Sequence, residues 1–181
     1  MELSQKALNI AQKNQLLKED AEVLIDLSGF YNQQGKYDTA LEYSQKALTA
    51  SKKLNNPELE YSVLGIFRDI YQKQGKYKKA LEFAQKVYAL LEKQNLGIHK
   101  ITTLTSLSGI YLNLGDTVKA EETAKQAINI AKENENSNGE ALGLIYLTQA
   151  YKFQGKYEEG IETAKKSLQI SRQNKNFQGE I

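Results

Sequence analysis

The 181-residue sequence contains no cysteine and no tryptophan, and it has a single histidine and a single proline. The absence of cysteine excludes disulfide bridges, thiolate zinc sites and cysteine nucleophiles. One histidine, His99, cannot form a multi-histidine metal or catalytic site, so we expect it to be a surface residue. Gly-rich phosphate loops, EF-hand patterns and nucleophile elbows are also missing. We therefore expect no enzyme activity, no catalytic or metal-binding residue and no cofactor.

Long apolar runs and a strong net charge are missing as well. No run approaches the length of a membrane-spanning helix, and the first residues lack the apolar core of a signal peptide. The net charge is +2, from 24 basic and 22 acidic residues. This balance gives no reason to expect nucleic acid or an anionic membrane as partner. The composition is that of a folded protein. Because the sequence shows neither a signal peptide nor a membrane-spanning run, we expect a cytoplasmic location.

What the sequence does contain is a repeat with a period of 40 residues. Gln–Gly–Lys–Tyr occurs at 34–37, 74–77 and 154–157, and the remaining place in this register, 114–117, reads Leu–Gly–Asp–Thr. Self-similarity at a fixed period of this length is the signature of a solenoid or another repeat architecture. A tyrosine also stands four residues ahead of each glycine, at Tyr31, Tyr71, Tyr111 and Tyr151.

Apolar spacings predict two helices in each repeat. Leu24, Leu27 and Tyr31 are three and four residues apart, which places them on one face of a helix. The glycine that follows can adopt the left-handed conformation that ends a helix, and Asn-rich segments separate one helix pair from the next. The sequence predicts helices over residues 18–34, 36–53, 57–74, 76–94, 98–114, 116–134, 138–154 and 156–173, with a further helix near 2–14.

This pattern resembles the tetratricopeptide repeat. That family has large residues, a small residue and tyrosine in the first helix, Gly–x–Tyr at the turn, and small residues in the second helix. The period of 40 exceeds the usual ~34 residues, which makes the chain similar to the long-helix subclass of kinesin light chains, spindle-polarity adaptors and bacterial signalling proteins. The second unit shows the pattern with Leu64, Phe67, Tyr71, Gly75, Tyr77, Ala80 and Ala84.

The resemblance implies an all-α fold, a right-handed superhelix of antiparallel helix pairs with about nine helices in one array over 1–181. Residues 1–15 would be the second helix of a truncated unit, and 176–181 would begin another. We therefore expect a fragment of a longer array, whose uncovered apolar ends favour head-to-tail self-association. The four complete helix pairs would occupy 18–53, 57–94, 98–134 and 138–174.

The resemblance also implies a role in protein–protein interaction, as a scaffold or adaptor that binds a peptide or helix in its concave groove. First-helix residues that are not needed for packing would line this groove. Glycines within these helices have two interpretations, close helix packing or widening of the groove. By register, the candidate partner-binding residues are Glu22, Asp26, Gly29, Asp69, Gln72, Thr105, Gly109, Asn113, Tyr146, Gln149 and Phe153.

Within this groove the fourth unit is the apolar and aromatic part. Leu142 and Ile145 stand in the same register as Tyr146 and Phe153. We therefore expect Tyr146 and Phe153 to anchor an apolar side chain of the partner.

One subtype of the family can be compared with this sequence at its partner-binding positions. Some tetratricopeptide domains grip chaperone C-termini with a basic clamp, but the matching positions here hold residues such as Ile25, Gly65 and Thr105. The resemblance therefore does not extend to that subtype.

As an alternative to the scaffold role, the array would be a regulatory or sensor segment of a larger, bacterial signalling protein with a separate effector domain.

The turn that departs from the repeat predicts an irregular joint. Asp116 can cap the helix that follows it. Thr117, however, lacks the volume of Tyr37, Tyr77 and Tyr157, which we expect to fill the gap between paired helices. The sequence therefore predicts a repacked or loosened site around Thr117.

Overall fold

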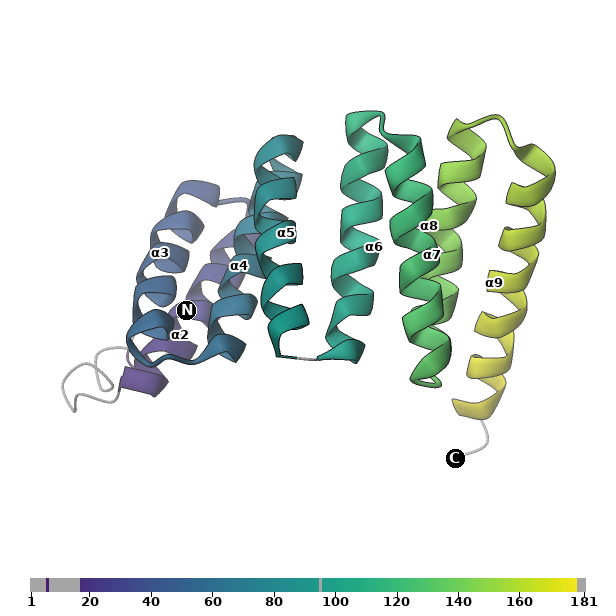
Figure 1. Ribbon diagram of the computed structural model, residues 1–181. Helices are drawn as coiled ribbons and strands as arrows, with labels where there is room; N and C mark the ends of the chain where they lie inside the picture. The colour runs from purple at the N-terminus through teal and green to yellow at the C-terminus, as the bar shows by residue number, and fades with distance from the viewer. Residues whose placement is uncertain (1–5, 7–16, 95, 179–181) are drawn as a thin grey trace. The chain divides into compact units, whose positions relative to one another are not determined.

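The computed structural model describes residues 6, 17–94 and 96–178, with the backbone alone for 175–178. Within these residues there are eight helices and no strand (Figure 1). The helix predicted near 2–14 lies outside the described residues, except for Lys6. The helices are α2 (Leu17–Gln33), α3 (Tyr37–Lys53), α4 (Pro57–Lys73), α5 (Tyr77–Lys93), α6 (Gly97–Leu114), α7 (Thr117–Glu133), α8 (Ser137–Phe153) and α9 (Tyr157–Gln178).

The helix limits follow the predicted ones closely. Each of these helices begins within one residue of its predicted start, and all but α9 end within one residue of the predicted end. α9 continues to Gln178, through residues 176–178 that the sequence assigned to a following unit. The helix continues past its predicted end because this segment contains neither glycine nor proline to end it.

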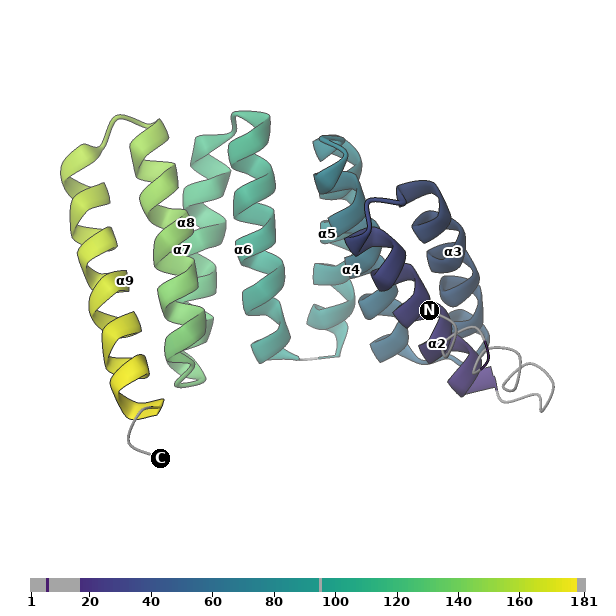
Figure 2. The ribbon, with the colours of Figure 1, turned by 180° about the vertical axis from the view of Figure 1, so that it is seen from behind.

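The chain divides into two compact units, residues 1–90 and 91–181, and each is described by itself. The first unit contains α2, α3, α4 and most of α5, and the second contains α6 to α9. Successive helices within each unit run antiparallel, as Figures 1 and 2 show from opposite sides. First helices also contact each other, α2 with α4 and α6 with α8. Each unit is therefore a stack of antiparallel helix pairs, which confirms the all-α fold class.

The glycine of the repeated turn ends each first helix, as predicted. Gly115 ends α6 with φ of 81°, and the three glycines in the same register have φ of 70° to 76°. This left-handed conformation is strained for residues with a side chain. The Asp116 amide then donates to the Tyr111 carbonyl at 2.9 Å, and the equivalent hydrogen bond forms in the other three turns. The repeated tetrapeptide thus marks a helix end, which is a feature of the fold.

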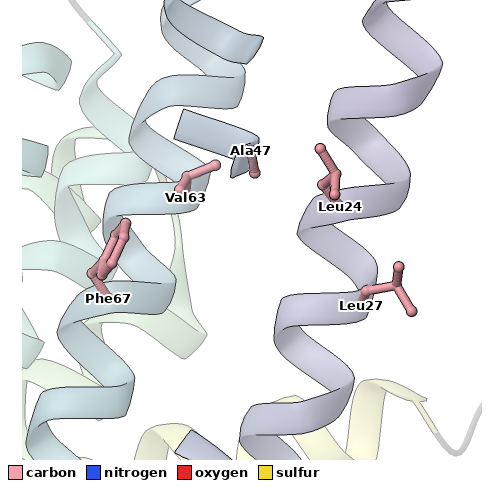
Figure 3. Packing of buried hydrophobic residues seen from close by; sticks show 5 residues of the cluster. All are labelled: Leu24, Leu27, Ala47, Val63 and Phe67. Atoms are coloured by element: carbon pink, nitrogen blue, oxygen red, sulfur yellow. The ribbon is translucent and has the colours of Figure 1, made fainter. Parts of the chain in front are cut away.

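The core of the first unit joins three helices around a small residue. Leu24 and Leu27 of α2 form a buried cluster with Ala47 of α3 and with Val63 and Phe67 of α4. Figure 3 shows Ala47 between Leu24 and Val63. The short side chain of Ala47 allows the three helices to approach closely, so that each pair is stabilised by the next.

The tyrosines of the repeat lie at the edge of this core. Tyr31 is half-buried and stacks on Tyr43 with ring centroids 5.4 Å apart. The Lys36 ammonium lies 5.8 Å from the Tyr31 ring centroid, within the range of a cation–π contact. The prediction that Tyr157 fills a gap between paired helices is wrong, because this residue is 67% exposed. The turn tyrosine is therefore not a core residue in every repeat.

Candidate functional site

The candidate partner-binding residues lie on the first helices, which contact each other within each unit. α2 and α4 position the set of the first unit, and α6 and α8 position that of the second. The sets are Glu22, Asp26, Gly29, Asp69 and Gln72 in the first unit, and Thr105, Gly109, Asn113, Tyr146, Gln149 and Phe153 in the second.

In the first unit the candidate residues form a polar surface. Glu22 and Asp26 are exposed, and the Glu22 carboxylate lies 3.7 Å from the Lys18 ammonium. The Asp69 carboxylate accepts a hydrogen bond from Arg68 Nε at 2.9 Å and lies 2.8 Å from Arg68 Nη2, with which it forms an ion pair. Part of the acidic charge on this surface is therefore already compensated by neighbouring cations.

The helix-interior glycines divide between the two interpretations. A Cβ atom built on Gly109 would lie 2.9 Å from the Tyr146 ring, so glycine at this position lets Tyr146 pack on α6. A Cβ atom on Gly29 would meet nothing within 4 Å, and one on Gly65 would meet only the tip of Arg68, at 3.9 Å. Close packing therefore explains Gly109 and does not explain Gly29.

The candidate residues on α6 are mostly engaged within their own helix. Thr105 is only 2% exposed, and its hydroxyl donates to the Thr102 carbonyl at 3.0 Å. The Asn113 side-chain amide is exposed but donates to the Gly109 carbonyl at 2.7 Å. α6 therefore contributes little polar contact surface, and its main effect at the site is to seat Tyr146.

α8 carries one of the exposed apolar surfaces of the second unit. Leu142, Ile145 and Phe153 are 39%, 44% and 65% exposed, and Gln149 between them is exposed as well. Spacings of three, four and four residues place these four side chains on one face of α8, which we call the α8 stripe. Tyr146 lies beside the stripe and is half-buried. Exposed apolar side chains that share one helix face are typical of interaction surfaces.

The turn that departs from the repeat is filled by a polar network. Asp116 caps α7, as predicted, by accepting an amide hydrogen bond at 3.1 Å. The Gln154 side-chain amide donates to the Thr117 carbonyl at 2.9 Å, and the Lys156 ammonium lies 3.3 Å from the Glu121 carboxylate. The site around Thr117 is therefore repacked, with polar residues from the turn between α8 and α9 taking part.

Glu121 is the charged centre of this network. Burial acts to raise the pKa of Glu121, but hydrogen bonds from Lys125, Gln154 and Lys156 outweigh it and lower the pKa to about 2. The Lys125 ammonium is the nearer cation, 2.6 Å from the carboxylate. Glu121 thus stays charged at neutral pH and joins α7 to the turn before α9.

We expect Glu121→Gln to destabilise the second unit by about 1 kcal/mol at neutral pH, because a charged hydrogen-bond acceptor is lost. A carboxylate with a folded pKa below its unfolded value of 4.5 stabilises the fold above that pH, and this contribution is lost as the pH falls through about 2. Urea unfolding followed by circular dichroism should show the variant and the wild type converging over this range. Glu122→Gln, at an exposed neighbour, should match the wild type throughout. A gap that persists below pH 2 would contradict the assignment.

Two cavities lie away from the candidate residues. One of about 650 Å³ in the second unit is lined by Ile98, residues 134–138, Gln173 and Asn174. One of about 340 Å³ in the first unit is lined by Leu17, Asp20, Leu24 and residues of α3. Neither includes a candidate partner-binding residue.

Across 17–94 and 96–178 no cluster of three or more histidine, aspartate or glutamate side chains could hold a metal ion. No helix in the described part of the chain is long and apolar enough to cross a membrane. His99 lies at an exposed position at the start of α6.

Comparison with protein families decides the assignment of the repeats. The tetratricopeptide repeat matches over residues 19–93, 69–133 and 147–174, well over half of the chain. The chain belongs to the tetratricopeptide repeat family. Tetratricopeptide repeat proteins are generally non-enzymatic interaction modules, so membership supports a scaffold role in protein–protein interaction. A sequence comparison with curated proteins gives no match.

Solved structures of tetratricopeptide repeat proteins share this fold. The nearly identical repeats of a putative kinesin light chain from Podosopora anserina match with a TM-score of 0.74 and 16% identity, over 97% of this chain and 94% of theirs. A Rap protein complexed with Competence and Sporulation Factor matches with a TM-score of 0.76 and 19% identity, over 85% of this chain and 43% of its own. A signal transduction ATPase with a tetratricopeptide repeat sensor, from Pyrococcus horikoshii, matches with a TM-score of 0.80 and 20% identity, over 98% of this chain and 29% of its own. The kinesin light chain match confirms the resemblance to repeats of the 40-residue period.

Proposed function

We propose that the chain is a protein–protein interaction module that binds a peptide or helix along the α8 stripe of its second unit. The observation that carries this proposal is the exposure of Leu142, Ile145 and Phe153 in one row. Covering large apolar side chains is favourable, at about 25 cal/mol per Å² of apolar surface removed from water. The likeness to a Rap protein complexed with Competence and Sporulation Factor supports a binding role of this kind.

The chemistry of the stripe indicates the partner. Ile145 and Phe153 would receive two apolar anchors, and Gln149 between them offers an amide donor and acceptor. Lys152 is exposed beside Phe153 and would favour a carboxylate next to the second anchor. An amphipathic segment with apolar residues at helical spacing and an acidic residue at one end fits these features.

The polar surface of the first unit is proposed as a second contact region. Glu22, Asp26 and Asp69 favour basic side chains in the segment of a partner that meets this unit. Gln72 and the open position at Gly29 belong to the same surface. In the second unit the buried Thr105 is left out of the contact surface, and Gly109 acts by seating Tyr146.

Peptides selected from a displayed random library against the chain should carry apolar anchors. Phe153→Ala should weaken the binding of such a peptide about tenfold or more, since truncating a central aromatic anchor is costly. Isothermal titration calorimetry measures the change. Val118→Ala is the matched control, because it truncates a 61% exposed apolar side chain on α7 and should leave binding unchanged. Equal affinities for the two variants would refute the proposed surface.

A role as a sensor segment is the second candidate, supported by the likeness to the tetratricopeptide repeat sensor of the signal transduction ATPase. In that role, binding of a partner at the α8 stripe would alter the arrangement of the helix pairs, and this change would be transmitted to an effector domain. Small-angle scattering with and without a selected peptide distinguishes the two functions. A changed distance distribution supports the sensor, and an unchanged one supports the scaffold.

A further inference from the structure

α9 exposes a row of apolar side chains that is separate from the α8 stripe. Tyr157, Ile161, Ala164 and Leu168 are all exposed, with 56% of Ile161 and 51% of Leu168 accessible. Their spacings of four, three and four residues place them on one face of the helix, which we call the α9 face. Isolated exposed apolar residues are ordinary, but four in a row on one helix face form an interaction surface.

The repeat itself shows what covers this face on a preceding helix. Ala124 and Ile128 of α7 stand 40 residues before Ala164 and Leu168, and both are buried. A Cβ atom built on Gly143 of α8 would lie 2.7 Å from Ile128 Cγ1 and 3.5 Å from the Ala124 carbonyl oxygen. An antiparallel helix therefore lies directly on these positions of α7, whereas the equivalent Ala164 and Leu168 of α9 are exposed.

Charges along the edge of the α9 face change sign along the helix. Glu158, Lys165 and Arg172 are exposed and seven residues apart, so they align along one edge. Away from this edge, Glu162 and Lys166 pair with each other at 2.7 Å. The edge is thus acidic at its start and basic at its end. A second α9 running in the opposite direction presents the opposite charge at each end.

We propose that two copies of this chain pair through their α9 faces, antiparallel, about a two-fold axis beside Ala164. Ile161 then packs on Leu168 of the second copy, and Glu158 meets Arg172 of the second copy, with each contact made twice. The small side chain of Ala164 at the axis lets the helices approach closely. Lys165 lies opposite its own counterpart, which limits the strength of the dimer. This pairing does not depend on peptide binding at the α8 stripe, and it differs from the head-to-tail contact predicted from the sequence.

Sedimentation velocity over a concentration series provides the first test. An interface formed by one helix face is small, so the average mass should rise towards that of a dimer between about 10 µM and 1 mM. Leu168→Glu should raise the dimer dissociation constant about tenfold or more, whereas Gln173→Glu, which adds the same charge outside the α9 face, should not. Lys165→Gln should lower the dissociation constant, because it removes the like charge at the axis. A strict monomer at 1 mM overturns the proposal.

Two further variants test the geometry of the pair. Because the chain has no cysteine, Ala164→Cys should give a disulfide-linked dimer under mild oxidation, and Glu159→Cys on the opposite side of α9 should not. Glu158→Arg and Arg172→Glu should each weaken the dimer, and the double exchange should restore it. If the chain self-associates but Ala164→Cys gives no cross-link, or the double exchange does not restore the dimer, the antiparallel pair is overturned. The copies would then meet through another surface, such as a head-to-tail contact.

Discussion

Replacing Gly143 with valine should destabilise the second unit by about 3 kcal/mol, near the upper end of what overpacking costs. Even a single added Cβ would lie 2.7 Å from Ile128 Cγ1 and 3.3 Å from the Ile128 backbone nitrogen. Ile128 is branched at Cβ and nearly buried, so it has few alternative rotamers. The backbone of α7 or α8 would have to move, and the packing between these helices would be lost.

The matched control is Gly29→Ala, because Gly29 also lies inside a first helix but a Cβ there meets nothing within 4 Å. This variant should stabilise the first unit by about 0.5–1 kcal/mol, since alanine is the better helix former. Urea unfolding measures both changes, and hydrogen exchange of α7 and α8 amides would localise the effect of Gly143→Val, as a repeat stack need not unfold in one step. A neutral Gly143→Val variant would show that the contact with α7 is not as tight as the geometry requires.

The helix limits were predictable because short-range chemistry sets them. Turn glycines adopt positive φ, and Asn56 caps α4 by accepting from the Glu58 and Leu59 amides at 3.0 and 3.2 Å. Such signals act over a few neighbouring residues, so they can be recognised in the amino-acid sequence. Where such a signal was absent, prediction was poorer, since α9 continues past its predicted end at residue 173 to Gln178. Glu135 also adopts the left-handed conformation, with φ of 51°, although glutamate gives no hint of it.

The candidate site was less predictable because exposure depends on neighbouring helices. Register placed Thr105 and Phe153 alike on first-helix surfaces, yet Thr105 is 2% and Phe153 65% exposed. The tight contact of Gly143 with Ile128 was not predicted, for the same reason. Helical spacing shows on which face of its helix a residue lies, but it does not show which neighbouring helix packs on that face. The prediction that Tyr157 is a core residue assumed that neighbouring helices bury the turn tyrosine in every repeat. In the structure Tyr157 is exposed.

Ile128→Ala and Leu168→Ala should therefore differ sharply in effect, although the two residues occupy the same place in the 40-residue repeat. Ile128 is 6% exposed and packs in a cluster with Ala124, Leu144 and Leu147. Its truncation removes buried apolar surface and leaves a cavity, so it should cost about 3 kcal/mol of unfolding free energy.

Leu168 stands 40 residues later on α9 and is half exposed. Its truncation should cost the monomer less than about 1 kcal/mol, because most of its surface is already in water. Unfolding measured at micromolar concentration, where the proposed pairing of α9 faces is weak, compares the two variants directly. Similar losses of stability at that concentration would mean that Leu168 is covered within the monomer, and the α9 face could then not be a docking surface. A small loss at low concentration with a weakened dimer at high concentration would instead show that a second copy provides on α9 the cover that α8 provides on α7.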